Sequence, residues 1–305
     1  MVNMKRFLFA LTLFASFVSL NVNAGRNEVT LAMNKGDYVM ALKELRRLAD
    51  TGDTEAQTNI GFLYANGLGV PVDNSLALEW YRKAAAKGNA KALLNLGVMY
   101  ENGVGVKKDL AQAVSYYEKS SSKGDVGGTS NLGMMYLDGL GVKRDPAKAV
   151  ALFKEAAQKG DAKAQTNLGF AYLEGVGVAK DDATGIAWIK KAANQGDADS
   201  EFNLGAAYEF GKGVAANPTE AVAWYRKAAV QGQPIAQYNL ALKLAKGSGA
   251  EPNIPEAYMW LSLSAESGYP EAKEKLTFLT SKASIHQVDE GKKLLASWKL
   301  RQNSR

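Results

Sequence analysis

Six asparagines recur along the chain at a constant interval of 36 residues: Asn59, Asn95, Asn131, Asn167, Asn203 and Asn239. A primary amide carries two N–H donors and one carbonyl acceptor, so a row of amides can hold the backbone of a bound peptide. The same amides could instead bond the neighbouring repeat and fix how the repeats stack. Recurrence in every repeat favours this structural role, but the sequence leaves both roles open.

Apolar and basic side chains flank these asparagines at fixed offsets. Residues one before and three after an asparagine share its face on a helix, and lysines four before it extend that face. The members of this set are Phe62, Lys91, Leu94, Val98, Met134, Lys163, Phe170, Phe202 and Tyr238. An apolar stripe with charged neighbours predicts a surface that binds an apolar or helical peptide. The alternative is that adjacent helices bury half of the stripe.

Residues that usually perform catalysis or hold metals are almost absent. The 305 residues include no cysteine and one histidine, His286, which excludes disulfides, thiolate ligands, a cysteine nucleophile and histidine-rich metal sites. No acid–base constellation surrounds His286 in the sequence, and the serines at 120–122 have no histidine nearby. We therefore predict no catalytic residue, no metal site and no cofactor.

Basic residues recur in three successive loops, at Lys107, Lys108, Lys143, Arg144 and Lys180. Solvated loop charge is the simplest interpretation, and an acidic protein face or an anionic polymer is the expected ligand if these residues bind anything. The formal net charge is +6, with acids mixed throughout, which gives little support for nucleic acid as a partner.

Each 36-residue repeat predicts two helices. The first begins after a capping residue such as Asp53 and buries a face that includes a mid-helix glycine such as Gly61. Glycine costs about 1 kcal/mol relative to alanine at such a position, so we expect it to allow close approach of the partner helix. A Gly-x-Gly pair then ends the first helix with the positive φ that glycine tolerates. These pairs follow a helix, whereas phosphate-binding glycine loops follow a strand.

The clearest repeat reads Ala164-x-x-x-Leu168-Gly169-x-x-Tyr172-x-x-Gly175-x-Gly177-Val178, followed by Asp181, Trp188 and Lys191-Ala192-Ala193-x-x-Gly196. This pattern resembles the Sel1-like repeat, a relative of the tetratricopeptide repeat. The resemblance implies an all-α fold, a right-handed α/α superhelical solenoid of six 36-residue helix-turn-helix repeats with helical caps. It also implies that the first helices line a concave surface that binds proteins or peptides.

Two repeats depart from the pattern. The third has Ser120-Ser121-Ser122 where other repeats have Lys-Ala-Ala, followed by Gly127-Gly128. We interpret this stretch as a softened joint between two helices, because serine and glycine weaken helices. The sixth replaces the glycine and tyrosine of its first helix by Ala241 and Leu244.

The ends of the chain differ from the repeats, so we divide it into a signal peptide at 1–24, an N-terminal helical cap at 25–52, six repeats at 53–268 and a C-terminal helical cap at 269–305. The signal has basic Lys5 and Arg6, an apolar run over 7–18 and small residues before a cleavage site after Ala24. That run is too short to span a bilayer, which favours a cleaved signal over the alternative of an uncleaved membrane anchor. Helices are expected over 37–50, 271–279 and 284–301, the last covering the final repeat with Ile285, Val288, Leu294, Leu295 and Trp298.

The sequence therefore predicts a monomeric, periplasmic or secreted scaffold that binds an unidentified protein or peptide on its concave face, with no membrane segment after signal removal. It could regulate or assemble envelope or secreted complexes. The alternative is a cell-wall-associated ligand binder or enzyme, because some exported members of the family have been linked to β-lactam or peptidoglycan recognition. Those members tend to carry a cysteine pair in each repeat, which this chain lacks. A third alternative is a purely structural spacer.

Overall fold

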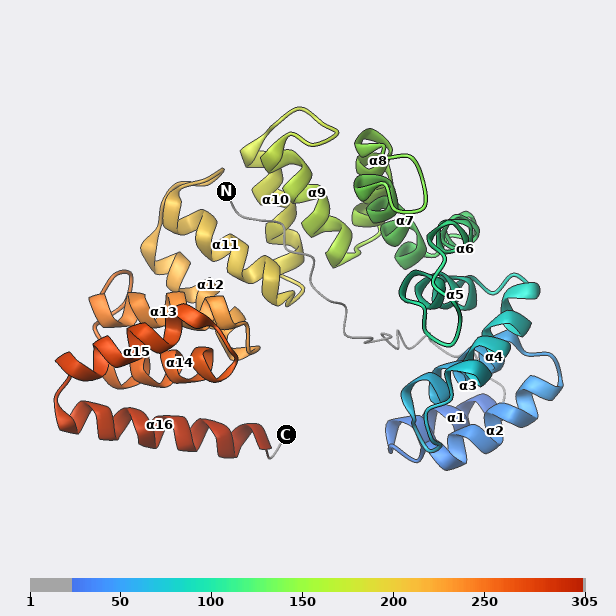
Figure 1. Ribbon diagram of the computed structural model, residues 1–305, viewed down its shortest axis with the longest axis horizontal. Helices are drawn as coiled ribbons and strands as arrows, with labels where there is room; N and C mark the ends of the chain where they lie inside the picture. The colour runs from blue at the N-terminus through green and yellow to red at the C-terminus, as the bar shows by residue number, and fades with distance from the viewer. Residues whose placement is uncertain (1–23, 304–305) are drawn as a thin grey trace. The chain divides into compact units, whose positions relative to one another are not determined.

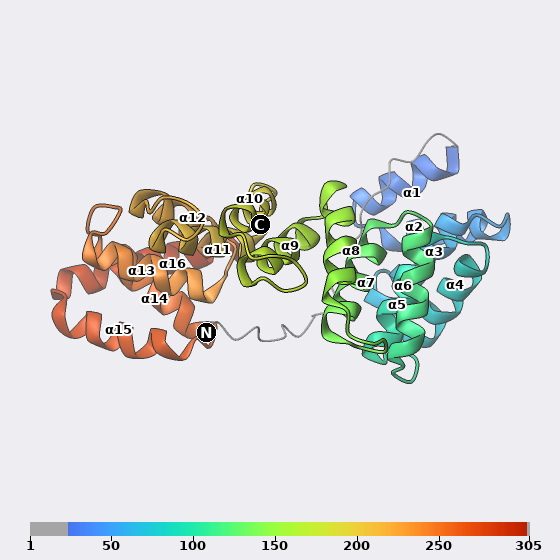
Figure 2. The same ribbon diagram turned by 90° about the horizontal axis from the view of Figure 1, so that it is seen from above.

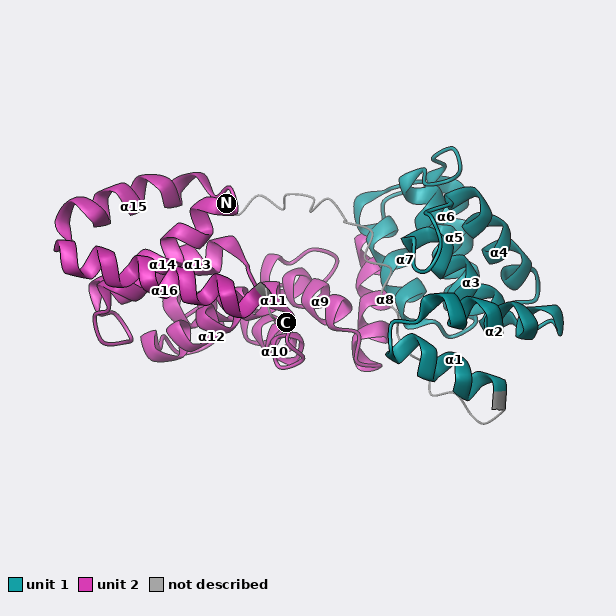
Figure 3. Cartoon of the chain, turned by 90° about the horizontal axis from the view of Figure 1, so that it is seen from below, with its two compact units in different colours: residues 1–145 teal, residues 146–305 magenta. Residues whose placement is uncertain are grey.

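The computed structural model describes residues 24–303, so the expected signal peptide lies outside the described residues except for Ala24. Sixteen α-helices and no strand are found in the part of the chain that is described. This confirms the all-α class. The chain divides into two compact units, Met1–Asp145 and Pro146–Arg305, and the division falls between the two helices of the third repeat (Figure 3).

Unit 1 is a stack in which each helix packs against the next one along the chain, from α1 to α7 (Figures 1 and 2). α2 is the helix expected at 37–50, and α1 precedes it through a short turn at Gly36. The helices of unit 1 are α1 (Ala24–Asn34), α2 (Tyr38–Asp50), α3 (Thr54–Asn66), α4 (Asn74–Ala86), α5 (Ala90–Asn102), α6 (Leu110–Ser122) and α7 (Val126–Asp138).

Unit 2 continues the same helix-turn-helix pattern and ends in two helices that both pack on α14 (Figure 1). Its helices are α8 (Pro146–Gln158), α9 (Ala162–Glu174), α10 (Asp182–Ala193), α11 (Ala198–Phe210), α12 (Pro218–Val230), α13 (Pro234–Lys246), α14 (Ile254–Glu266), α15 (Pro270–Lys282) and α16 (Ile285–Asn303). Leu294, Leu295 and Trp298 of α16 pack against the core, with the Trp298 ring 4.9 Å from that of Trp260. Ile285 does not cover the last repeat as expected, because it is 84% exposed at the start of α16.

Side-chain caps set where the helices begin. Asp73 accepts a hydrogen bond from the Leu76 backbone N–H at 2.9 Å, and Asn89 does the same for Ala92 at 2.9 Å. These bonds satisfy N–H groups that a helix leaves unpaired in its first turn. Each first helix from α3 to α13 ends at a glycine in the left-handed region, such as Gly67 with φ 66°.

The second glycine of each Gly-x-Gly pair has an additional task. A Cβ at Gly69 would lie 2.7 Å from the backbone of Tyr38, at the start of the preceding second helix. Gly105 approaches Asn74 in the same way. The turn that ends a first helix therefore also packs on the previous repeat, which explains why the second glycine recurs.

The mid-helix glycines allow the close approach that the sequence predicts. A Cβ at Gly61 would lie 2.7 Å from Cε1 of Tyr81. A Cβ at Gly205 would likewise lie 2.7 Å from Cδ1 of Tyr225. In the fourth repeat Gly169 faces Gly185, so the backbones themselves come close. Each of these contacts packs the two helices of one repeat directly together.

The serines and glycines at 120–128 form a close contact between α6 and α7. Ser120 is fully buried and donates to the Ala90 carbonyl at 2.9 Å, and a Cβ at Gly128 would lie 2.6 Å from that of Ser120. The interpretation of this stretch as a softened joint stays a prediction, because these contacts show close packing and not stiffness. Small residues here allow α6 and α7 to pack closely.

Buried polar side chains connect several of the first helices to a neighbouring helix. Gln165 donates from Nε2 to the Ala157 carbonyl at 3.1 Å, and Gln237 donates to Ala229 at 3.1 Å. Glu201 takes the equivalent place in α11, where its side chain is buried and accepts a hydrogen bond from Gln231 at 2.8 Å. Burial raises the pKa of the Glu201 carboxyl, and the charge of Asp197 adds to the rise, while Gln231 and Lys227 oppose it.

The close contact at Gly61 can be tested by adding a methyl group. Gly61→Ala should destabilise the chain by about 1 kcal/mol, because crowding against Tyr81 outweighs the better helix propensity of alanine. The double variant Gly61→Ala/Tyr81→Leu copies Ala241 and Leu261 of the sixth repeat and should recover part of the loss. Urea unfolding followed by circular dichroism measures both. An alanine variant as stable as the parent chain would contradict the contact.

The buried carboxyl of Glu201 predicts a pH-dependent stability. The pKa of the Glu201 carboxyl is higher in the folded chain than in the unfolded chain, where it is about 4.3. The carboxyl therefore contributes its full stabilisation to the fold below about pH 4.3, and this stabilisation is lost as pH rises through the folded pKa. Glu201→Gln should therefore stabilise the chain by about 1 kcal/mol at pH 7, by donating to Ala193 as the other glutamines do to their carbonyls, and by almost nothing at pH 4. The matched reverse change, Gln165→Glu, should destabilise at pH 7 and approach the parent at pH 4. Equal effects at both pH values would rule out the carboxyl as the cause.

Candidate protein-binding surface

The asparagines lie at equivalent places on the first helices. In unit 1 they lie on α3, α5 and α7, and in unit 2 on α9, α11 and α13, and all six are half-buried. We call the exposed side of these helices in each unit the first-helix face. Asn131 hydrogen-bonds to the hydroxyl of Tyr117 on the preceding helix, whereas Asn203 donates to the Asp199 carbonyl of its own helix at 2.7 Å. The first bond fits the structural role and the second fits neither role, so the structure does not give one role to all six.

The apolar stripe is half-buried in both units. In unit 1, Phe62 packs against the core, and Leu94, Val98 and Met134 are likewise partly covered. In unit 2, Phe202 lies 5.7 Å from the ring of Tyr225, and Tyr238 lies 5.1 Å from Tyr269. Phe170 packs against the core beside α10. Adjacent helices thus bury part of the stripe and leave the rest at the first-helix face.

The two lysines of the predicted surface differ in their surroundings. Lys91 is half-buried, and its charge acts on Asp125 at the start of α7. Burial raises the pKa of the Asp125 carboxyl, while the Gly128 N–H and Lys91 oppose the rise. Lys163 is exposed at the start of α9. Lys91 therefore contributes to the local packing of unit 1 as well as to its surface.

Two tyrosine–glutamate pairs connect the core to the first-helix face, and the sequence analysis missed them. The Tyr117 hydroxyl donates to Glu101 at 2.5 Å, and Tyr225 donates to Glu209 at 2.7 Å. Burial, and then the nearby glutamate, raises the pKa of each phenol. The signal was present, because glutamate precedes tyrosine by 16 residues in both repeats.

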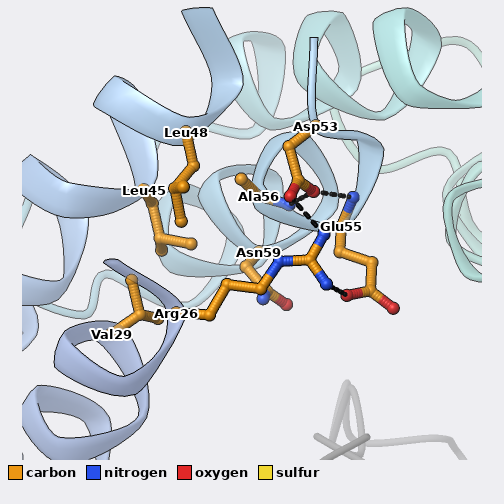
Figure 4. Close-up of a pocket in the computed structure, with 8 residues that line it drawn as sticks. All are labelled: Arg26, Val29, Leu45, Leu48, Asp53, Glu55, Ala56 and Asn59. Carbon is orange, nitrogen blue, oxygen red and sulfur yellow. Dashed lines mark hydrogen bonds and ion pairs between the residues drawn. The ribbon is translucent and has the colours of Figure 1, made fainter. Parts of the chain in front are cut away.

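A small hollow, open to solvent, lies between α1, α2 and α3 (Figure 4). Val29, Leu45, Leu48 and Ala56 form its apolar side. Its polar residues are Arg26, Asp53, Glu55 and Asn59.

Arg26 crosses this hollow and pairs with Asp53 at 2.5 Å and with Glu55 at 3.6 Å. Burial opposes ionisation of Asp53, but the Ala56 N–H and Arg26 outweigh it and lower the pKa of the carboxyl. The hollow places Asn59 beside an ion pair that the sequence analysis did not find.

The remaining candidates do not form a chemical site. His286 is exposed on α16, and no group of three or more metal-binding side chains occurs among residues 24–303. The loop cations Lys107, Lys108 and Lys143 of unit 1 are exposed, and Arg144 donates to the Leu137 carbonyl at 2.9 Å. Lys180 of unit 2 pairs with Asp182 at 3.5 Å. None of the helices in the described range is long and apolar enough to cross a membrane.

Comparison with solved structures finds close relatives of this arrangement. The crystal structure of a protective antigen of uropathogenic Escherichia coli, which displays an SLR fold, is 32% identical with a TM-score of 0.69. The match covers 91% of this chain and 64% of that chain, so this chain spans less than two thirds of that relative. A Sel1 repeat protein from Oxalobacter formigenes is 30% identical with a TM-score of 0.70, over 80% of this chain and 97% of that one. A search of curated protein sequences finds no match.

The profile of the Sel1 repeat matches six consecutive segments, at residues 54–89, 90–125, 128–161, 162–197, 198–233 and 234–269. This confirms the resemblance, the six repeats and the solenoid class that it implies. Sel1 repeats form a non-catalytic scaffold that commonly mediates protein–protein interaction. The chain belongs to the Sel1 repeat family.

Proposed function

We propose that this chain is an exported Sel1 repeat scaffold that binds a protein or peptide partner on its concave, first-helix face, and that it regulates or assembles an envelope or secreted complex. The observation that carries the proposal is the half-exposed row of asparagines and apolar side chains on the first helices within each unit. Half-burial fixes the conformation of these side chains before a partner arrives, which reduces the entropy that binding costs.

The chemistry of this face fits a peptide with apolar anchors. Aromatic side chains such as Phe62 and Phe202 offer large contact areas, and the asparagine amides beside them can pair with a peptide backbone. The partner is a protein rather than a nucleic acid, since acidic and basic residues are mixed along the chain. The chain itself acts as a monomer.

Export rests on the sequence of the first 24 residues, with cleavage after Ala24 and a periplasmic or secreted destination. The relative that is a protective antigen of a uropathogenic strain supports a location outside the cytoplasm. Gly25 is buried against α2, since a Cβ there would lie 3.5 Å from Leu48. Cleavage must therefore precede the packing of α1.

Binding at the first-helix face can be tested by photo-crosslinking in the cells that produce the protein. A photoreactive amino acid at Phe62 or Phe202 should give a discrete adduct with one partner, because these side chains lie on the proposed surface. Matched probes at exposed Val72, on the α3–α4 loop, and at exposed Val230, at the end of α12, should give none. Equal adducts from all four positions, or none from any, would contradict the proposal.

Substitution gives the corresponding affinity measurement once a partner is in hand. Phe202→Ser should weaken capture at least about tenfold, since truncating an aromatic anchor commonly costs more than 1 kcal/mol. Val230→Ser should bind normally, and helical circular dichroism of both variants should match that of the parent chain.

Cleavage can be tested by the mass and N-terminal sequence of the exported protein. We expect the mature chain to begin at Gly25, because signal peptidase accepts small residues at −3 and −1. Ala24→Phe should leave the precursor uncleaved, whereas Asn23→Gln, at the tolerant −2 position, should not. A mature chain that retains the first 24 residues would refute this part of the proposal.

A further inference from the structure

The tyrosine–glutamate pairs of the second and fifth repeats share one geometry. In each, a fully buried tyrosine ring lies on the mid-helix glycine of its repeat, and its hydroxyl donates to a glutamate four residues after that glycine. Glu101 and Glu209 are half-exposed, so their carboxylates lie at the first-helix face. A carboxylate at this face thus satisfies the donor of a buried phenol.

The first repeat has the same tyrosine without the glutamate. Tyr81 is 0% exposed and its ring lies on Gly61, but the residue four after that glycine is Ala65. The Tyr81 hydroxyl is buried and has no hydrogen-bond partner among the residues that the structure describes. A buried hydroxyl without a partner destabilises the folded chain, because it loses its hydrogen bonds to water and gains none in the protein.

Other repeats avoid this cost by removing the hydroxyl. In the fourth repeat Leu173 replaces the glutamate, and Ile189 replaces the tyrosine. In the sixth repeat Ala245 replaces the glutamate, and Leu261 replaces the tyrosine. The pair of Tyr81 and Ala65 is thus a departure from the chain's own rule. Burial also raises the pKa of Tyr81, so the phenol keeps its proton and remains a donor at neutral pH.

The place left by the missing glutamate lies on the first-helix face of unit 1. Ala65 is half-exposed on α3, and its side chain ends at Cβ, whereas a glutamate in this position extends to the hydroxyl. The asparagine equivalent to Asn131, which bonds Tyr117, is Asn95 on α5. An entering group at this place would meet one neutral donor, the phenol of Tyr81.

We propose that Tyr81 and Ala65 form a subsite for a carboxylate supplied by the partner, which accepts the hydrogen bond that Glu101 and Glu209 accept in their own repeats. The partner group is the side chain of an aspartate or glutamate, or a C-terminal carboxylate. This subsite rests on the proposed function for its biological meaning, but its chemistry can be tested without any partner.

The test is a titration of the full chain, with tyrosine labelled by ¹³C at Cζ, with sodium propionate as the probe. The Tyr81 signal, assigned by its absence in Tyr81→Phe, should shift saturably with a dissociation constant on the order of 10 mM, as expected for so small a ligand. Propionamide should give no shift, and the signals of Tyr117 and Tyr225 should not move. No response of Tyr81 to propionate, or an equal response to propionamide, would overturn the proposal.

A second variant tests the geometry. Ala65→Glu should raise the urea midpoint of unfolding, move the Tyr81 signal toward that of Tyr117, and abolish the response to propionate, because the new side chain occupies the subsite. An unchanged signal in this variant would show that a carboxylate on the first-helix face does not reach Tyr81, and the proposal would fail.

Partner binding then separates this inference from the proposed function. Tyr81→Phe and Ala65→Glu should each lower the affinity for a captured partner at least about fivefold. Tyr225→Phe, the matched control, should leave that affinity unchanged. A partner with amidated termini distinguishes a C-terminal carboxylate from an acidic side chain. Partner binding that ignores both variants would overturn the subsite and leave the scaffold function standing. If Tyr81 responds to propionate but no partner protein is found, the subsite would stand and the scaffold function would fail.

Discussion

The packing of a second-helix side chain against a glycine in the first helix is the contact on which the rest of this structure depends. Because Gly61 and Gly205 have no Cβ, the rings of Tyr81 and Tyr225 lie directly on the helix backbone. That contact sets the spacing of the two helices and determines how far the tyrosine hydroxyl reaches. A substituted first helix would be pushed away, and the hydroxyl would no longer approach the first-helix face. The fold and the chemistry of that face thus share one cause.

Glycine also couples one repeat to the next. The first residue of each Gly-x-Gly pair ends a helix in the left-handed conformation, and the second lies against the start of the preceding second helix. A side chain at either place would affect both the turn and the stacking. This double use explains how the spacing of 36 residues is kept without interruption from Gly67 to Gly249. It also explains why repeats of one length stack regularly, since each turn is a contact surface for its neighbour.

The regular parts of this molecule could be predicted from the sequence because their causes are local. Capping residues, helix-ending glycines and the mid-helix glycine each act within one repeat, and six copies make the pattern plain. α1 was not foreseen as a separate helix, because it joins α2 through a short turn without a Gly-x-Gly pair, and so Arg26 could not be placed beside Asp53. The exposure of Ile285 and the half-burial of Phe62 depend on how helices cross, which periodicity does not determine. The tyrosine–glutamate pairs were readable only as a correlation between distant positions.

Polar groups inside the stack are where one repeat of this chain can differ from another without loss of the fold. Apolar core positions are held by packing, so alanine and leucine recur there with little variation. A buried polar group instead needs a specific partner, and three repeats meet that need differently: Gln165 with Gln195, Glu201 with Gln231, Tyr117 with Glu101. Where the chain supplies no partner, as at Tyr81, the unmet donor marks one repeat among six. A scaffold made of equivalent units can distinguish one place on its surface from the others only through such differences, so recognition is expected to depend on them.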